Sequence, residues 1–157
     1  MSFYQFTHFQ KIPADRLTVW GFIASPDNLK EITPPYMGFT VTGKTGGDTM
    51  YPGMIITYKV SPVLGLPLKW VTEITHVQQG EYFVDEQRLG PYRLWHHQHK
   101  LESIDGGVAM HDIVTYVPPF GPIGALANKI FIERQLRRIF DYRKIAIEHR
   151  FGPFRAQ

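Results

Sequence analysis

The stretch LWHHQHKLESIDGGVAMHDIVTYVPPFGP, residues 94–122, decides the fold class of this chain. Two segments within it, 94–104 and 107–117, alternate in hydropathy with a period of two, which predicts β-strands. Asp-Gly-Gly at 105–107 separates them and is typical of a tight hairpin turn, so we expect the strands to be adjacent and antiparallel. Two prolines at 118–119 then end the sheet, because proline has no backbone N–H to donate.

Residues 122–150 contain no internal proline, and we predict that they form one long helix. The apolar side chains of this helix fall on a single stripe: Ala125, Ile132, Leu136, Ile139, Phe140 and Ile147. Arg143 lies in the middle of the same stripe. A sheet followed by one amphipathic helix predicts that the helix covers the apolar face of the sheet.

The period of two extends back from the hairpin to Met37. It predicts four further strands, at 38–43, 54–61, 68–77 and 81–89. The intervening sequence PVLGLP, residues 62–67, is predicted to be a loop with an apolar surface. At the N-terminal end, Phe3 to Ile12 is predicted to form one more strand.

Two short helices are expected between the first strand and the others. Pro13 stops the first strand and fits the first turn of a helix. Apolar residues then recur at helical spacing: Leu17, Trp20, Ile23 and Ala24. Ser25 is a good N-cap for a second helix, with Pro26 at its first position, and Pro34-Pro35 ends it.

The length of 157 residues fits one domain, residues 1–157. We therefore predict an α+β fold: a curved antiparallel sheet of six or seven strands wrapped around a long C-terminal helix, with two short helices after the first strand. Such a sheet twists and curls, so the covering helix leaves room for a cavity. The aromatic fraction of 14% is typical of a cavity lining, and equally of the preference of aromatic residues for strands.

The composition excludes several classes of site and location. The chain has no cysteine, which excludes disulfides, a thiolate metal site and a cysteine nucleophile. Without a signal peptide or an apolar run of about 20 residues, we expect a cytoplasmic protein that does not insert into membranes. Eight basic and three acidic residues lie in 120–157, which is more typical of a solvated helix face than of a nucleic-acid or membrane surface. No nucleic-acid motif, phosphate loop or Gly-x-Ser-x-Gly elbow is present.

The residues most suited to chemistry lie on the two hairpin strands. Trp95, His97, His99 and Leu101 share one strand face, and the apolar ends of this row assign it to the interior. The next strand offers a matching row: Met110, Asp112, Val114 and Tyr116. An aspartate opposite a histidine fixes its tautomer and raises its basicity.

Three interpretations of the two histidines stay open at this stage. They bind a ligand in an apolar pocket, they bind a metal as an H-x-H pair, or they are core histidines satisfied by Asp112 and Tyr116. For a metal, the natural third ligand is Glu102, but it points to the opposite face from His99. We therefore expect neither a metal nor a cofactor.

Arg143 on the sheet-facing stripe requires a partner, because a buried guanidinium must be paired. The candidates are Glu86, Asp112, Asp85 and an acidic ligand headgroup; the inward face of strand 81–89 is undecided, since this strand lacks apolar alternation. The residues predicted to contact a ligand are Met54, Ile56, Tyr58, Trp70, Thr72, Trp95, His97, His99, Met110, Asp112, Tyr116, Leu136, Phe140 and Arg143.

The order of elements, together with IPADRLTVWGFIASPDNLKEITPP, GPYRLWHHQH, MHDIVTY and VPPFGP, resembles the START-related superfamily, also called SRPBCC, and within it a bacterial ligand-binding, polyketide cyclase-like branch. The resemblance covers nearly the whole chain and implies a helix-grip fold with a deep cavity. The W-x-H-x-H and D-x-V-x-Y patterns of that branch fall on Trp95, His97, His99, Asp112 and Tyr116, while Leu101 replaces a frequent Phe. The iron and cluster ligands of the oxygenase relatives have no counterpart here.

These features favour a non-enzymatic binding protein, a monomer or homodimer, for a hydrophobic or aromatic small molecule such as a lipid, polyketide or isoprenoid. The first alternative is a cyclase or dehydratase, in which His97 or His99 moves a proton with Asp112 behind it. Tyr116 or Arg143 then stabilises an enolate. The second alternative is a protein-interaction or cell-division regulatory module that acts through the basic C-terminal helix.

Overall fold

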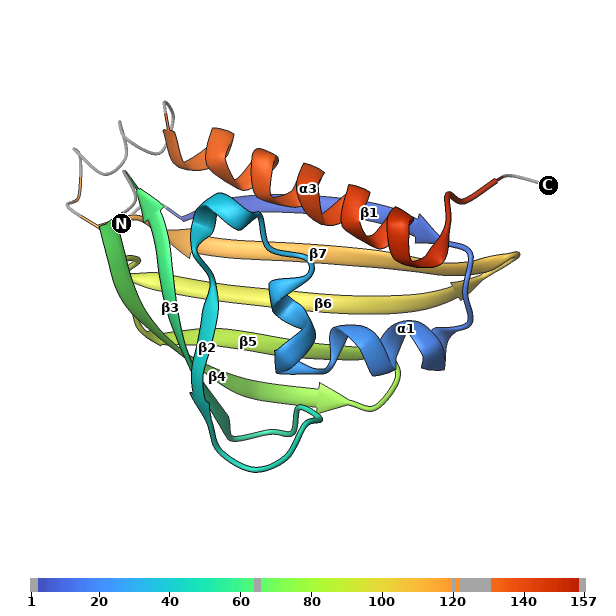
Figure 1. Ribbon diagram of the computed structural model, residues 1–157, viewed down its shortest axis with the longest axis horizontal. Coiled ribbons are helices and arrows are strands. Elements are labelled where there is room, and N and C mark those ends of the chain that lie inside the picture. The colour runs from blue at the N-terminus through green and yellow to red at the C-terminus, as the bar shows by residue number, and fades with distance from the viewer. Residues whose placement is uncertain (1–2, 64–65, 120, 122–130, 156–157) are drawn as a thin grey trace.

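The structure, a computed structural model, describes residues 3–63, 66–119, 121 and 131–155 (Figure 1). Its seven strands form one antiparallel sheet in the order β1-β7-β6-β5-β4-β3-β2. The strands are β1 (Tyr4–Ile12), β2 (Thr40–Lys44), β3 (Met54–Val63), β4 (Leu66–Gln78), β5 (Tyr82–Leu89), β6 (Leu94–Ile104) and β7 (Gly107–Val117). The helices are α1 (Arg16–Ile23), the 3-10 helices η1 (Pro26–Lys30) and η2 (Pro35–Met37), and α3 (Glu133–Phe151). The predicted fold class is confirmed.

The hairpin of β6 and β7 forms the centre of the sheet. Its strands pair from Leu94 with Val117 to Ile104 with Gly107, as the turn sequence predicts. Gly107 allows a close approach, because a side chain there would collide with the carbonyl oxygen of Ile12. Strand β1 can therefore lie directly against β7, which places the chain's first strand beside its last.

Helix α3 runs along the concave side of the sheet (Figure 1). Its buried side chains are Leu136, Phe140, Arg143 and Ile147, four members of the predicted stripe. The chain around 131–132 is already helical, and α3 ends at Phe151, one residue beyond the predicted end. Residues 122–130, and with them Ala125, lie outside the described residues.

The predicted loop at 62–67 is partly wrong. Val63 belongs to β3 and pairs with Leu66 at the start of β4, so the two strands continue into this segment. Proline is tolerated here because each strand has a single neighbour at this level. The pairing of β2 with β3 ends at Lys59, and that of β4 with β5 ends at Val71.

The two short helices differ in detail from the prediction. Helix α1 begins at Arg16 rather than at Pro13, because the Asp15 side chain accepts a hydrogen bond of 3.0 Å from the Thr18 amide and caps it. The second helix is a 3-10 turn without a side-chain cap, and Pro35 begins another one instead of only ending it. Of the predicted α1 stripe, Leu17 is exposed.

The buried apolar side chains form two separate clusters. The larger one joins α1 to β3, β4 and the far end of α3, and includes Trp20, Met54 and Ile147. The smaller one, centred on Phe6, Tyr116 and Phe140, joins β1 and β7 to the near end of α3, and its other members are Val114 and Leu136. Polar side chains lie between the two clusters, and they form the site described below.

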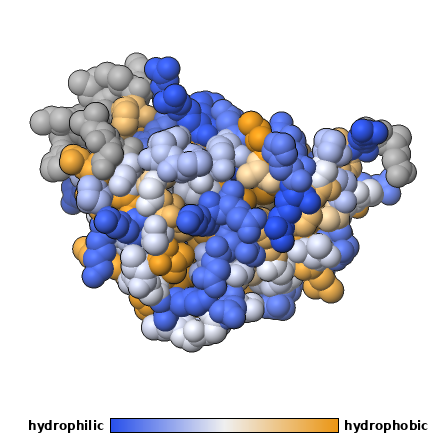
Figure 2. All heavy atoms as spheres, viewed as in Figure 1, coloured by the Kyte–Doolittle hydropathy of each residue, from blue (hydrophilic) through white to orange (hydrophobic). Residues whose placement is uncertain are grey.

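The surface seen in Figure 2 is mostly hydrophilic, with small apolar patches between the polar side chains. No helix within the described part of the chain combines the length and the apolar character needed to cross a bilayer.

Candidate functional site

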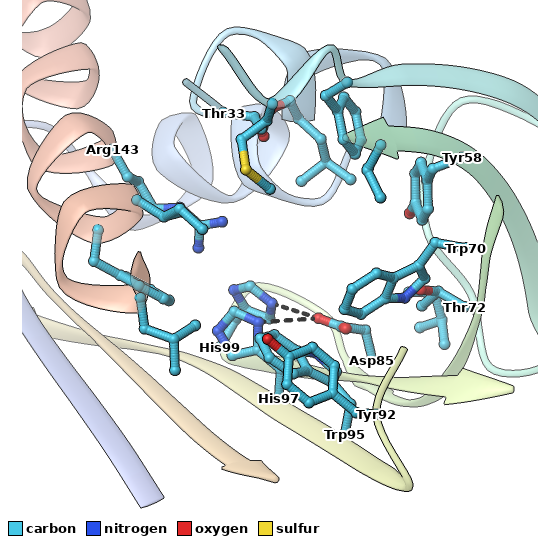
Figure 3. Close-up of a pocket in the computed structure, with 18 of the residues that line it drawn as sticks. Thr33, Tyr58, Trp70, Thr72, Asp85, Tyr92, Trp95, His97, His99 and Arg143 are labelled. Atoms are coloured by element: carbon cyan, nitrogen blue, oxygen red, sulfur yellow. Dashed lines mark hydrogen bonds and ion pairs between the residues drawn. The ribbon is translucent and has the colours of Figure 1, made fainter. Parts of the chain in front are cut away.

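A cavity of about 160 Å³ lies between α3, the concave face of the sheet and the segment that carries η1 and η2 (Figure 3). This volume lies below the roughly 300–1,000 Å³ of pockets for drug-sized molecules, so it suits a smaller ligand. The lining residues are Leu29, Thr33, Met37, Phe39, Met50, Tyr58, Val60, Trp70, Thr72, Ile74, Phe83, Asp85, Tyr92, Trp95, His97, His99, Gln135, Leu136, Ile139, Phe140 and Arg143.

One wall of the cavity is aromatic. The rings of Trp70 on β4 and Trp95 on β6 lie 5.3 Å apart and nearly perpendicular, and Tyr92 lies 4.9 Å from Trp95 and 5.8 Å from Trp70. Tyr92 comes from the β5–β6 connection, which Gln87 fixes by two hydrogen bonds to the Tyr92 backbone. Burial raises the pKa of Tyr92, so its hydroxyl stays protonated. This wall offers flat apolar surface to a ring system.

Directly beside the aromatic wall, on the same face of the sheet, two histidines and two aspartates form adjoining cross-strand rows, and the rings of Trp95 and His97 lie 6.2 Å apart. We call this group, together with Arg143, the charged wall. In one row Asp85 on β5 pairs with His97 on β6. In the other, Asp112 on β7 lies between His99 on β6 and His8 on β1. Asp85 is thus directly opposite His97 and diagonal to His99. Asp112 is directly opposite His99 and diagonal to His97. All these side chains point to the concave face, because alternate residues of a strand share a face.

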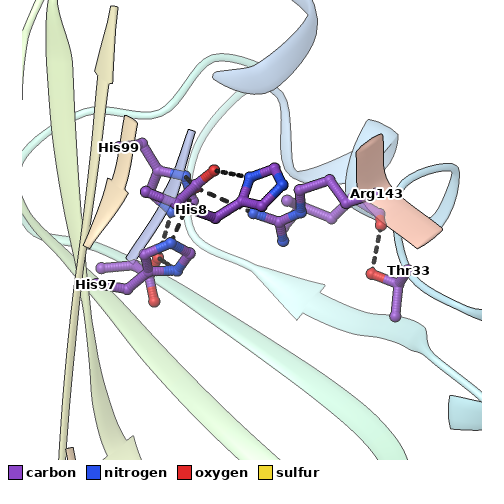
Figure 4. Close-up of polar contacts among 8 residues, drawn as sticks. His8, Thr33, His97, His99 and Arg143 are labelled. Carbon is purple, nitrogen blue, oxygen red and sulfur yellow. Dashed lines mark hydrogen bonds and ion pairs between the residues drawn. The ribbon is translucent and has the colours of Figure 1, made fainter. Parts of the chain in front are cut away.

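The histidines bridge the two aspartates. His97 bonds to Asp112 through Nε2 at 3.0 Å, and its Nδ1 lies 3.3 Å from Asp85 Oδ2. His99 bonds to the same Asp85 oxygen through Nε2 at 2.8 Å, and its Nδ1 lies 3.0 Å from Asp112 Oδ1 (Figures 3 and 4). The two rings lie 3.7 Å apart, and both side chains are buried.

Arg143 from α3 completes this group. Its Nη1 lies 3.2 Å from Asp112 Oδ1, so of the predicted carboxylate partners Asp112 is the one in contact. The Arg143 guanidinium also lies over the Phe140 ring at 4.7 Å. Glu86 faces the other side of the sheet, where it bonds to His96 at 2.7 Å.

The charges of this group shift its protonation equilibria. Burial alone would raise the pKa of Asp112, but the neighbouring imidazoles of His8, His97 and His99 and the Arg143 charge hold it well below its usual range. The pKa of Asp85 is likewise lowered, because the two imidazoles outweigh its burial. Burial would lower the pKa of His97, yet the Asp85 charge and the bond to Asp112 raise it. Both carboxylates are therefore ionised at neutral pH.

The structure brings nine of the predicted ligand residues to the cavity lining: Tyr58, Trp70, Thr72, Trp95, His97, His99, Leu136, Phe140 and Arg143. The other five, Met54, Ile56, Met110, Asp112 and Tyr116, are buried outside the lining. Asp112 still belongs to the site, because it contacts the lining residues His97, His99 and Arg143. Whether any of these residues binds a ligand stays a prediction.

Sequence reasoning missed several lining residues. Asp85 was a candidate only as a partner of Arg143, and its position opposite His97 settles the undecided face of β5. Tyr92 follows Gly-Pro in a connection, where strand periodicity gives no orientation. Leu29, Thr33, Met37 and Phe39 come from the η1–η2 segment, whose packing over the cavity has no local sequence pattern.

Comparisons with known proteins identify the fold. No family model matches the chain, and no curated protein matches it in sequence. The protein CV1439 from Chromobacterium violaceum matches in structure with a TM-score of 0.70 at 12% identity, over 96% of this chain and 99% of that one. The major latex-like protein 151 from Panax ginseng gives 0.67 at 9% identity, over the same shares of the two chains. A protein from Arthrobacter aurescens gives 0.69 at 13% identity, over 92% and 86%.

The chain has the helix-grip fold. The sheet order, the covering helix and these structural relatives all agree on this, and the fold part of the predicted resemblance is confirmed. At such low identities the likeness extends to the fold alone. The bacterial ligand-binding branch, a cytoplasmic location and the oligomeric state stay predictions.

Proposed function

We propose that this protein binds a compact, largely apolar small molecule, with its ring system against Trp70, Tyr92 and Trp95 and an oxygen-bearing end towards Arg143. A single observation carries this proposal: the cavity has an aromatic wall and, directly beside it, a buried charged group. Apolar contact supplies roughly 25 cal/mol per Å² of buried surface, and the charged wall supplies orientation.

The volume narrows the class of ligand. A cavity of about 160 Å³ suits one or two fused rings or a short branched chain better than a full-length lipid. A polyketide-like aromatic or a short isoprenoid fits both the size and the aromatic wall.

The binding proposal is tested with 2-naphthoate, a fluorescent aromatic anion of two fused rings, and with a cavity-blocking variant. Ile139 lines the cavity from α3, so Ile139→Trp is expected to reduce the affinity for the probe at least about tenfold, since an indole there fills the space. Ile145→Trp on the exposed face of the same helix is the matched control. Unchanged probe binding by Ile139→Trp at equal folded stability rejects this cavity as the binding site.

A second candidate function is proton-transfer catalysis of the cyclase or dehydratase type. The observation that favours it is that His97 and His99 line the cavity while both contact ionised aspartates. An imidazole so placed can accept a proton from a bound substrate. His97→Ala separates the two functions: lost turnover of a candidate substrate with nearly unchanged affinity supports the enzyme, whereas lost affinity without turnover by either form supports the carrier.

A further inference from the structure

Three side chains at the charged wall have the composition of a metal site. Asp85, His97 and His99 each present one ligand atom, and these atoms lie within 4.8 Å of one another. The nitrogens that face Asp85 Oδ2 are Nδ1 of His97, at 3.3 Å, and Nε2 of His99, at 2.8 Å. Ligand atoms bound to one zinc-sized ion at about 2.0–2.2 Å lie roughly 2.9–3.4 Å apart, which the two nitrogen–oxygen separations approach, while the two nitrogens lie within 4.8 Å of each other.

Asp112 lies where an outer carboxylate would lie, that is, a carboxylate that does not bind the metal but hydrogen-bonds the histidines that do. It lies 3.0 Å from Nε2 of His97 and 3.0 Å from Nδ1 of His99, the two nitrogens that do not face Asp85. Metal-bound histidines usually donate their other N–H to such a group, which fixes the tautomer and the ring orientation. Asp112 has no solvent exposure, and Arg143 holds it from α3.

We propose that Asp85, His97 and His99 bind a divalent first-row transition-metal ion, with Asp112 as their outer carboxylate and the remaining coordination positions turned towards the cavity. Two imidazoles and one carboxylate suit Zn²⁺ or Fe²⁺ better than Ca²⁺ or Mg²⁺, which prefer all-oxygen sites. Three protein ligands leave at least one position for water or for an oxygen of a bound molecule. The three residues all line the cavity, so that position is accessible to its contents.

The ion also defines the polar end of the ligand, an extension that rests on the proposed function. The ion and Arg143 carry three positive charges against the two carboxylates of Asp85 and Asp112. The site therefore favours an anionic oxygen, as in a carboxylate, phenolate or enolate.

The test uses the full-length chain without an affinity tag, stripped of metal with a chelator. Co²⁺ is titrated at neutral pH and followed by its visible absorption, and Zn²⁺ is titrated by calorimetry. We expect one ion per chain, displacement of Co²⁺ by Zn²⁺, and proton release on binding. Asp112→Asn is expected to weaken Co²⁺ binding about 10–100-fold, as loss of an outer carboxylate does, and Asp85→Asn or His97→Gln at least as much.

His96→Gln is the matched control, because His96 lies on the same strand but on the opposite face, bonded to Glu86. Absence of Co²⁺ binding by the wild-type chain overturns the proposal, and so does binding that survives in Asp85→Asn. Should His97→Gln fail to fold, Asp85→Asn decides alone, since the Asp85 side chain is 17% exposed and asparagine keeps its size and shape. Probe binding to the cavity is measured on the same samples, so a failed metal site is distinguished from a failed cavity.

Discussion

Replacing Arg143 by methionine tests whether the charged wall is held together by the contact between α3 and β7. Arg143 Nη1 lies 3.2 Å from Oδ1 of Asp112, which has no solvent exposure. At an effective dielectric constant of about 20, two unit charges at that distance attract by about 5 kcal/mol. Breaking a buried pair from one side typically costs about 3–5 kcal/mol. Because His8, His97 and His99 still contact Asp112, we expect Arg143→Met to lower the free energy of unfolding by about 3 kcal/mol.

The measurement is urea denaturation at neutral pH in a chelating buffer, followed by far-ultraviolet circular dichroism. Arg137→Met is the matched control, since Arg137 forms an exposed pair with Glu133 on the same helix and is expected to change stability by less than about 1 kcal/mol. The double variant Asp112→Asn with Arg143→Met should be about 2 kcal/mol more stable than the sum of the single effects predicts. Strict additivity, or equal effects of Arg143→Met and Arg137→Met, would refute the reasoning.

Three further predictions concern stability. In metal-free protein, the raised pKa of His97 gives a contribution that is complete below about pH 6.5 and lost as pH rises through its folded value. The lowered pKa of Asp112 gives a contribution to stability that is complete above about pH 4 and lost as pH falls through its folded value. The free energy of unfolding in urea should therefore be greatest between about pH 4 and pH 6.5, and a flat pH profile contradicts this. Gly107→Ala should destabilise the fold by more than about 1 kcal/mol, whereas Gly47→Ala, with open space around it, should have no comparable effect in thermal denaturation. Phe140→Ala should cost about 3–5 kcal/mol, and a loss below about 1 kcal/mol would show that Phe140 is not a core contact.

Local sequence patterns were sufficient to predict most of the architecture. A period of two identifies the inward face of β6, since only one parity places Trp95 and Leu101 together. The Asp-Gly-Gly turn then fixes the register of β7, so Asp112 had to lie near the histidines. The helical stripe predicted the buried position of Arg143, which the structure bears out.

The remaining parts of the site depend on contacts between distant segments. Strand β5 has no apolar alternation, and its pairing with β4 contains two register shifts. The inward face of β4 therefore does not predict the inward face of β5, and only the structure places Asp85. Glu102 was the natural candidate for a third metal ligand because it is close in sequence, yet Asp85 from the neighbouring strand is close in space. Met37 and Phe39 reach the cavity through η2, which no helical periodicity predicts.

Because the apolar interior is divided into two clusters, the stability of the protein should depend on whether the cavity holds a ligand. Helix α3 contributes Ile147 to one cluster and Phe140 to the other, and the cavity lies beside the polar group that separates them. A ligand that fills the cavity contacts side chains of both clusters, so unfolding around either cluster removes part of its binding site. At a free concentration 100 times its Kd, such a ligand adds about 2.7 kcal/mol to the free energy of unfolding. A rise in melting temperature that is lost in Ile139→Trp therefore identifies compounds that fill this cavity.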